Sequence, residues 1–135
     1  MGMSEIEHIR PDGLFNNPAY THVVAARGQR LIHISGQVSI DAEGNVVGAG
    51  DLAAQTHQVM ANLGIALQAA GATFANVVKI TTFIVGYTPE SRSVVGDIRA
   101  GYLPADAPPA STLVGVAALA APDWLIEIEA TAVTD

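Results

Sequence analysis

The chain lacks cysteine altogether among its 135 residues. Disulfide bonds, thiolate nucleophiles and cysteine-ligated metal sites are therefore excluded. The histidines are few and scattered, and none has a short ligand spacing such as H-x-x-x-H. These histidines are His8, His22, His33 and His57. We therefore expect no bound metal.

Positive charge is also scarce, with 6 basic residues against 13 acidic residues and a net charge of −7. The basic residues form no cluster along the chain. They are Arg10, Arg27, Arg30, Lys79, Arg92 and Arg99. Nucleic-acid binding depends on clustered lysine and arginine that neutralise phosphates. The composition therefore argues against a nucleic-acid partner.

Long apolar runs are missing as well. The longest weakly polar run, TLVGVAALAAP, is too short and too broken to span a bilayer. The first ten residues have no apolar run typical of a signal peptide. We therefore expect a cytoplasmic protein with no membrane partner, folded as a single domain over residues 1–135.

Half of the residues are apolar, and only 14% are charged. A small monomer of this composition would expose a large apolar area, which usually marks an interaction surface. We therefore expect a homo-oligomer with a substantial apolar interface.

The pattern of apolar and turn-forming residues predicts a mixed α+β domain. Its expected order is three strands, a helix, a strand, a helix and two strands, with both helices on one face of a mixed sheet. A second subunit would cover the other face. The expected ranges are a hairpin of strands 21–26 and 30–35 with Gly28 in its turn, a glycine-rich connection over 41–50, a helix capped by Asp51 and Gly71, a strand over 77–85, a helix over 90–102 opened by Pro89, and strands over 111–118 and 125–133.

Two glutamates of the last strand, Glu127 and Glu129, share one face because alternate side chains of a strand point the same way. Both are solvated if this is an edge strand, which is the commoner case. Alternatively, a carboxylate in a cleft, with its pKa raised by partial burial, could act as a general base on water. The spacing of the two glutamates does not distinguish between these hypotheses.

Two other features also leave two interpretations open. Gly36 follows Ser35 at the end of an expected strand, where a glycine forms a bulge or lets a ligand approach its backbone N–H. Tyr20 lies beside a loop, where an aromatic side chain lines a ligand cleft or seals the rim of the core. The predicted hairpin would also bring His22 opposite His33.

Three segments together resemble the RidA/YjgF family, which is also labelled endoribonuclease L-PSP. They are SGQV at 35–38, the helix over 51–71, and PPASTLVGVAALAAPDWLIEIEATAV at 108–133. The resemblance implies a chorismate-mutase-like α+β fold, in which a six-stranded mixed sheet packs on two helices. It also implies a homotrimer whose sheets form a central barrel, with small-molecule ligands bound between subunits.

The chemistry implied by the resemblance is hydrolysis of reactive enamines and imines, such as 2-aminoacrylate and 2-iminobutanoate, to a 2-keto acid and ammonia without a cofactor. Glu127 matches the family glutamate that positions the hydrolytic water, whereas Glu129 is structural. Gly36 matches the glycine whose backbone N–H holds the ligand, and Tyr20 matches a tyrosine at the mouth of the cleft.

The chain departs from the deaminase members of this family at one position. These members carry an arginine that grips the substrate carboxylate, and Ser111 occupies that position here. A neutral hydroxyl cannot replace a guanidinium in binding an anion, and the sequence places no basic residue beside Ser111. We therefore expect an altered substrate, held by Gly36 and by the hydroxyls of Ser111 and Thr112, with Leu113 where many members have cysteine.

Two other functions remain open on the sequence. The first is a non-catalytic trimer that binds a small ligand in a regulatory role, in which Glu127 would be dispensable for binding. The second is RNA cleavage, which would require a steep dependence of RNA binding on salt. The acidic composition gives RNA cleavage no support.

Overall fold

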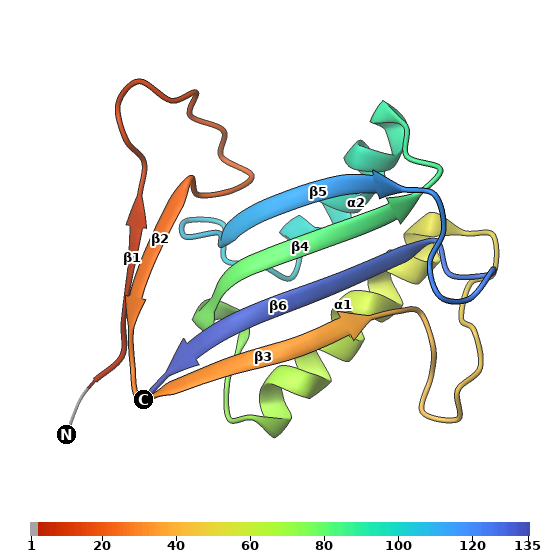
Figure 1. Cartoon of the computed structure of the whole chain (residues 1–135), viewed down its shortest axis with the longest axis horizontal. Coiled ribbons are helices and arrows are strands. Elements are labelled where there is room, and N and C mark those ends of the chain that lie inside the picture. The colour runs from red at the N-terminus through yellow and green to blue at the C-terminus, as the bar shows by residue number, and fades with distance from the viewer. Residues whose placement is uncertain (1–2) are drawn as a thin grey trace.

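The computed structural model describes residues 3–135, and its chain folds into two sheets and two main helices (Figure 1). Both helices pack on the same face of the larger sheet. The elements are β1 (Glu5–Ile9), β2 (Val23–Arg27), β3 (Arg30–Gln37), α1 (Leu52–Ala69), the short 3-10 helix η1 (Phe74–Asn76), β4 (Val77–Val85), α2 (Pro89–Ala100), β5 (Ala110–Val116) and β6 (Ile126–Thr134).

The larger sheet has four strands in the order β3-β6-β4-β5. β4 and β5 are parallel because α2 crosses between them, and β6 is antiparallel to both of its neighbours, β3 and β4. The α+β class is confirmed. The six strands do not form one sheet, however, because β1 and β2 pair separately as a two-stranded sheet.

The predicted hairpin of strands 21–26 and 30–35 is wrong in its pairing, although both strands exist. β2 pairs with β1, a strand for which the sequence analysis gave no range, and β3 pairs with β6. Gly28 lies so close to β6 that an added Cβ would be 3.2 Å from the carbonyl carbon of Thr134, and Gln29 N donates to Thr134 O at 3.0 Å. The chain therefore passes across the end of β6 instead of turning back on itself.

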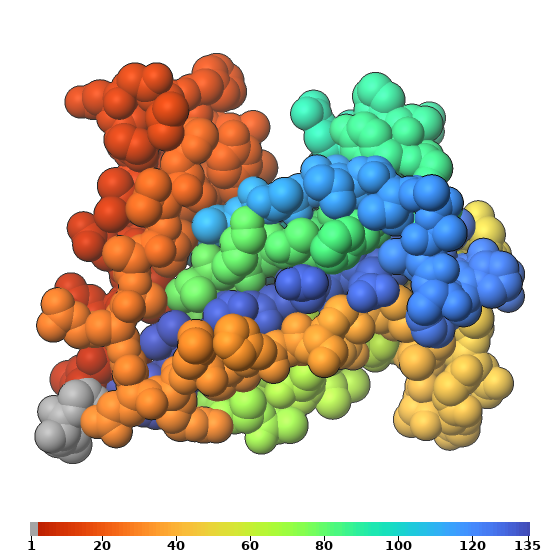
Figure 2. Space-filling view, in the orientation of Figure 1, coloured from red at the N-terminus to blue at the C-terminus, as the bar shows by residue number. Residues whose placement is uncertain are grey.

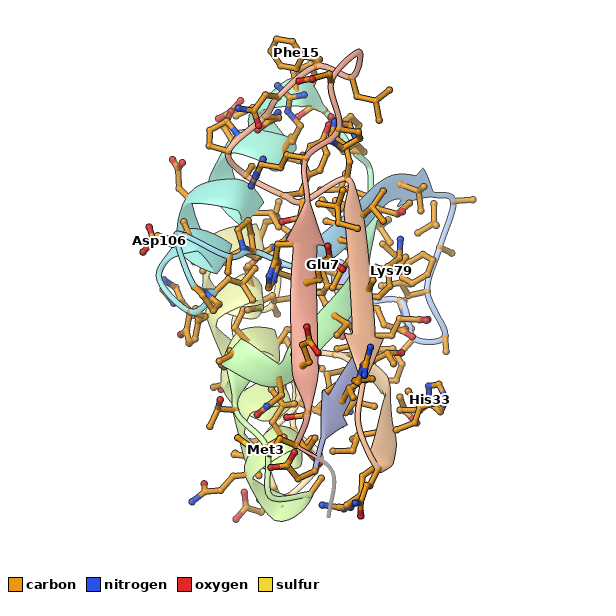
Figure 3. All side chains as sticks on the ribbon, turned by 90° about the vertical axis from the view of Figure 1, so that its left-hand side faces the viewer. Met3, Glu7, Phe15, His33, Lys79 and Asp106 are labelled. Atoms are coloured by element: carbon orange, nitrogen blue, oxygen red, sulfur yellow. The ribbon has the colours of Figure 1, made fainter. Side chains whose placement is uncertain are left out.

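Because that hairpin does not form, His22 and His33 do not face each other. A ring nitrogen of His22, Nε2, lies 2.7 Å from the carbonyl of Phe15, and Nδ1 of His33 lies 3.3 Å from Oγ1 of Thr131. Figure 3 shows His33 on the side of the large sheet that faces away from the helices.

The first helix begins as the sequence predicted, with the Asp51 side chain accepting a hydrogen bond from Ala54 N. Its last capping residue is Ala70, followed by Gly71 in the left-handed region at φ +78°. No helix within residues 3–135 is long and apolar enough to cross a membrane.

The core lies between the helices and the inner face of the large sheet. Alternate residues of the two central strands, such as Ile80 and Ile128, are fully buried there against Met60 and Leu63 of α1. The opposite side, which we call the open face, carries the other alternate residues and includes Leu31 with 63% of its surface exposed. The large sheet therefore separates two surfaces on which functional side chains can lie.

Candidate functional site

A hollow of about 770 Å³ lies between the loop that precedes β2, helix α2 and the start of β5. Figure 2 shows the molecule indented between the β1–β2 arm and α2. Three predicted site residues, Tyr20, Ser111 and Leu113, line this α2–β5 hollow. The structure therefore brings together residues that are some ninety positions apart in the sequence.

Thr21 fixes the position of Tyr20 at this hollow. Thr21 is buried, its Oγ1 donates to the carbonyl of Pro108 at 2.6 Å, and its N–H donates to the carbonyl of Pro109 at 3.2 Å. These two hydrogen bonds tie the loop to the proline-rich segment before β5. Tyr20 itself is half-buried at the rim.

The sequence analysis missed Arg99, a basic residue that lies directly beside Ser111. Arg99 is in the last turn of α2, is 7% exposed, and lines the α2–β5 hollow. Its Nη2 donates to Ser111 Oγ at 3.1 Å, and its Nη1 lies at the limit of hydrogen bonding to Thr82 Oγ1, at 3.5 Å. The sequence places no basic residue beside Ser111, but the fold brings Arg99 to it.

One signal in the sequence could have identified Arg99. It lies four residues after Val95 and four before Leu103, both of which are buried, so it occupies the apolar stripe of α2 and the turn that follows. A charged residue on such a stripe requires a partner or a function. Burial lowers the pKa of the Arg99 guanidinium through desolvation.

Glu127 and Gly36 meet on the open face, away from this hollow. The register between β3 and β6 shifts between Ile34 and Gln37, so Gly36 lies in a bulge. A Cβ added to Gly36 would lie 2.6 Å from Cδ of Glu127 and overlap the carboxylate. A larger residue at position 36 would therefore displace the Glu127 carboxylate from this position.

The position of β6 overturns one of the two hypotheses for its glutamates. β6 lies between β3 and β4, so it is a central strand and the edge-strand interpretation is wrong. Glu127 is half-buried opposite Phe83 of β4, whereas Glu129 is exposed opposite Thr81. The two carboxylates share a face but differ in environment.

Thr112 also lies on the open face, where Lys79 Nζ donates to its Oγ1 at 2.7 Å. Figure 3 shows Lys79 on the side opposite the helices. Ser111, by contrast, pairs with the buried Ile80 and contacts α2 through Arg99. The predicted residues therefore form two groups on opposite faces of one sheet, and a single chain does not join them.

Within residues 3–135, no group of three or more metal-ligating side chains could hold a metal ion. The chemistry available at the two groups is thus that of a carboxylate beside a backbone bulge and of a buried guanidinium beside a hydroxyl.

Residues 15–134 match the model of the family described as endoribonuclease L-PSP. A RutC family protein from Synechocystis is 35% identical over 84% of this chain and 85% of its own length. The human 2-iminobutanoate/2-iminopropanoate deaminase is 36% identical over 77% of this chain and 73% of its own. The Rid family protein YyfB from Yersinia pestis has a similar structure, with a TM-score of 0.88, 41% identity, and coverage of 95% of this chain and 98% of that one. The chain therefore belongs to the endoribonuclease L-PSP family, which is also known as the RidA/YjgF family.

Proposed function

We propose that this protein is a hydrolytic deaminase of a reactive enamine, an imine or a related small metabolite. The observation that carries the proposal is the Glu127 carboxylate, half-buried against the Gly36 bulge on a central strand. The similarity to 2-iminobutanoate/2-iminopropanoate deaminases supports the same class of reaction.

In the proposed reaction, Glu127 accepts a proton from a water molecule, and the water oxygen attacks the imine carbon. The C=N bond becomes a C–N single bond, and Glu127 passes its proton to the nitrogen to give a tetrahedral amino alcohol. Glu127 then takes the proton of the new hydroxyl and delivers it to the nitrogen as the C–N bond breaks, which leaves a keto group and ammonia. One water is consumed for each imine, and no electrons are exchanged.

The site is completed between subunits in this proposal. Glu127 and the α2–β5 hollow lie on opposite faces of the sheet, so they meet only when the open face of one chain lies beside the hollow of another. The exposure of Leu31 and Val114 on the open face, at 63% and 39%, supports packing of this face against other copies. We propose a homotrimer, as the family resemblance implies.

Ser111 sets the difference from the arginine-bearing deaminases. A serine is shorter than an arginine and carries no charge, so the start of β5 leaves open space and supplies no anion-binding group of its own. We therefore propose a substrate different from the smallest 2-imino acids, with Gly36 N–H and the Thr112 hydroxyl on the Glu127 side of the cleft.

The test compares wild type with Glu127→Gln on 2-imino acids generated in situ, by a threonine dehydratase for 2-iminobutanoate and by an L-amino acid oxidase for larger members. We expect wild type to accelerate formation of the 2-keto acid, with slower turnover of 2-iminobutanoate than the human deaminase achieves. Glu127→Gln should reduce the rate by about a hundredfold or more.

The non-catalytic alternative predicts a different outcome. In that case no imine in the series is hydrolysed above its spontaneous rate, and Glu127→Gln binds ligands as wild type does. Turnover of 2-iminobutanoate at the full rate of the human deaminase would contradict the altered specificity but not the reaction class.

A further inference from the structure

We propose that Arg99 is the anion-binding residue of the α2–β5 hollow, where it holds the carboxylate of a small organic acid with an apolar tail. The identity of that acid as a substrate rests on the proposed function, but the binding of the anion does not. The group that binds the carboxylate would thus lie on helix α2, next to Ser111, and not on strand β5.

Arg99 is buried without the partners that a structural arginine needs. A guanidinium has five N–H donors, and among residues 3–135 only Ser111 and Thr82 accept from it, through neutral hydroxyls. Its Nε is buried with no hydrogen-bond partner. Within the part of the chain that the structure describes, Arg99 forms no ion pair. A buried cation in this state is costly, and a bound anion would remove that cost.

The acidic residue of the same hollow does not neutralise Arg99. Asp97 is exposed and precedes Arg99 by two positions, and residues at that spacing on a helix do not face each other. Arg99 itself lines the hollow, and its guanidinium has N–H groups that neither Ser111 nor Thr82 uses. The Ser111 and Thr82 hydroxyls hold the plane of the guanidinium in place, which lowers the entropy lost on binding.

The lining of the hollow indicates the class of ligand. Ala100, Leu103, Pro108 and Leu113 give it apolar walls, which strengthen an ion pair with Arg99 by excluding water. Its volume of about 770 Å³ is in the range of sites for ligands larger than a three- or four-carbon acid. An apolar tail beyond the carboxylate fits this lining.

A carboxylate fits the charge of the site better than a phosphate. Arg99 is the one buried cation of the hollow within residues 3–135, because the other arginine, Arg92, is exposed at the rim. Arg99 also lies at the C-terminal end of α2, where the helix dipole is negative and disfavours a dianion. One arginine fork matches one carboxylate.

Titration calorimetry with pentanoate and its neutral analogue pentanamide tests the proposal on the intact protein. We expect pentanoate to bind wild type at least about tenfold more tightly than pentanamide. Arg99→Met should abolish this preference, and Arg99→Lys should retain part of it because the charge remains without the fork. Arg27→Met is the matched control, since it removes an exposed arginine outside the hollow, and should bind as wild type does.

Three outcomes would overturn the proposal. Arg99→Met could bind pentanoate as wild type does, inorganic phosphate could bind more tightly than pentanoate, or wild type could bind no anion while Arg99→Met dissociates the oligomer. The last result would show that a neighbouring subunit supplies the carboxylate. Pentanoate binding should persist in Glu127→Gln, so failure of the proposed reaction and failure of the anion site are distinguishable.

An exchange of the two positions is a second test. Ser111→Arg alone would place a second guanidinium next to buried Arg99, and we expect pentanoate to bind at least as tightly as to wild type, because a bound anion relieves the repulsion between the two cations. The double variant Ser111→Arg with Arg99→Ser keeps a single cation in the hollow and should retain the preference for pentanoate that Arg99→Met loses. Independent effects of the two changes on affinity would contradict the proposal, because only groups that contact each other are coupled this strongly.

Discussion

At position 36, the absence of a side chain makes room for the end of the Glu127 side chain from the neighbouring strand. An alanine Cβ would overlap the Glu127 carboxylate, with its Cδ only 2.6 Å away, so Gly36→Ala must displace that side chain. We predict that Gly36→Ala lowers turnover by about a hundredfold, as expected for a misplaced general base. The measurement is the rate of imine hydrolysis together with the melting temperature.

Gly64→Ala is the matched control for this substitution. Its added Cβ would make ordinary contact with Phe74 at 3.5 Å, and Gly64 lies in α1, away from both groups of site residues. Turnover of Gly64→Ala should equal that of wild type. An active Gly36→Ala would show that the position of Glu127 does not limit the reaction.

We expect Arg99 to raise the affinity for an anion without raising the free energy of unfolding. Replacing it by methionine removes a desolvated cation but keeps most of its volume, so we predict a free energy of unfolding unchanged or higher by about 1 kcal/mol. Urea denaturation without ligand measures this. A loss of about 2 kcal/mol or more would instead indicate a structural role for Arg99.

The sequence was informative about single residues where a family motif carries them. The motif singled out Glu127, Gly36 and Tyr20, and the structure places the first two in direct contact. Arg99 was not found because its partner Ser111 is brought to it by the crossover from α2 to β5, and no local pattern encodes that contact. The absence of an arginine at position 111 therefore suggested that the site lacks a positive charge.

At the scale of elements, Gln55 joins α1 to the start of β6. It is fully buried, its Nε2 donates to the carbonyls of Gly48 and Asp123, and its Oε1 accepts from Leu125 N at 2.9 Å. Gln55→Met would remove the partner of the Asp123 carbonyl and of Leu125 N, whereas the Gly48 carbonyl would keep its hydrogen bond from Asp51 N. We predict a loss of about 2–4 kcal/mol in the free energy of unfolding, measured by urea denaturation.

The same substitution at an exposed position of α1 controls for helix propensity and for added apolar surface. Gln68→Met should change the free energy of unfolding by less than about 0.5 kcal/mol. If Gln55→Met were equally mild, the three hydrogen bonds would not be what fixes the start of β6.

The existence of most elements was predictable, whereas the pairing of two of them was not. The strand over Val77–Val85 and the helix begun by Asp51 follow from β-branched residues and a capping side chain, which act locally. β2 pairs with β1, and the chain after β2 passes close to Thr134 at Gly28, which is a contact between distant segments. Local turn signals therefore predicted a hairpin that does not form.

At the scale of the whole molecule, the open face predicts association. Leu31 is 63% exposed on this face, and a lysine there would place a charge in the proposed apolar interface. We predict a particle of three times the 13.9 kDa chain mass for wild type and a monomer for Leu31→Lys, as measured by analytical ultracentrifugation. Ile65→Lys, equally exposed at 67% but on α1, should leave the assembly intact.

The loss of assembly should also remove turnover, because each chain holds the two groups of site residues on opposite faces. A monomeric Leu31→Lys that retains the wild-type rate would show that one chain contains a complete site. The exposed Phe15, at the tip of the loop between β1 and β2 (Figure 3), lies away from the open face and plays no part in this prediction.

Mixed trimers of two inactive variants test the shared site most directly. Glu127→Gln subunits retain Arg99 in the hollow, and Arg99→Met subunits retain the Glu127 carboxylate. Each mixed trimer therefore contains one subunit interface at which both groups are intact. After unfolding and refolding at equal concentrations, we predict recovery of about a quarter of the wild-type rate of imine hydrolysis. A mixture no more active than the sum of the two separate variants would contradict a site formed by Glu127 of one subunit and Arg99 of the next.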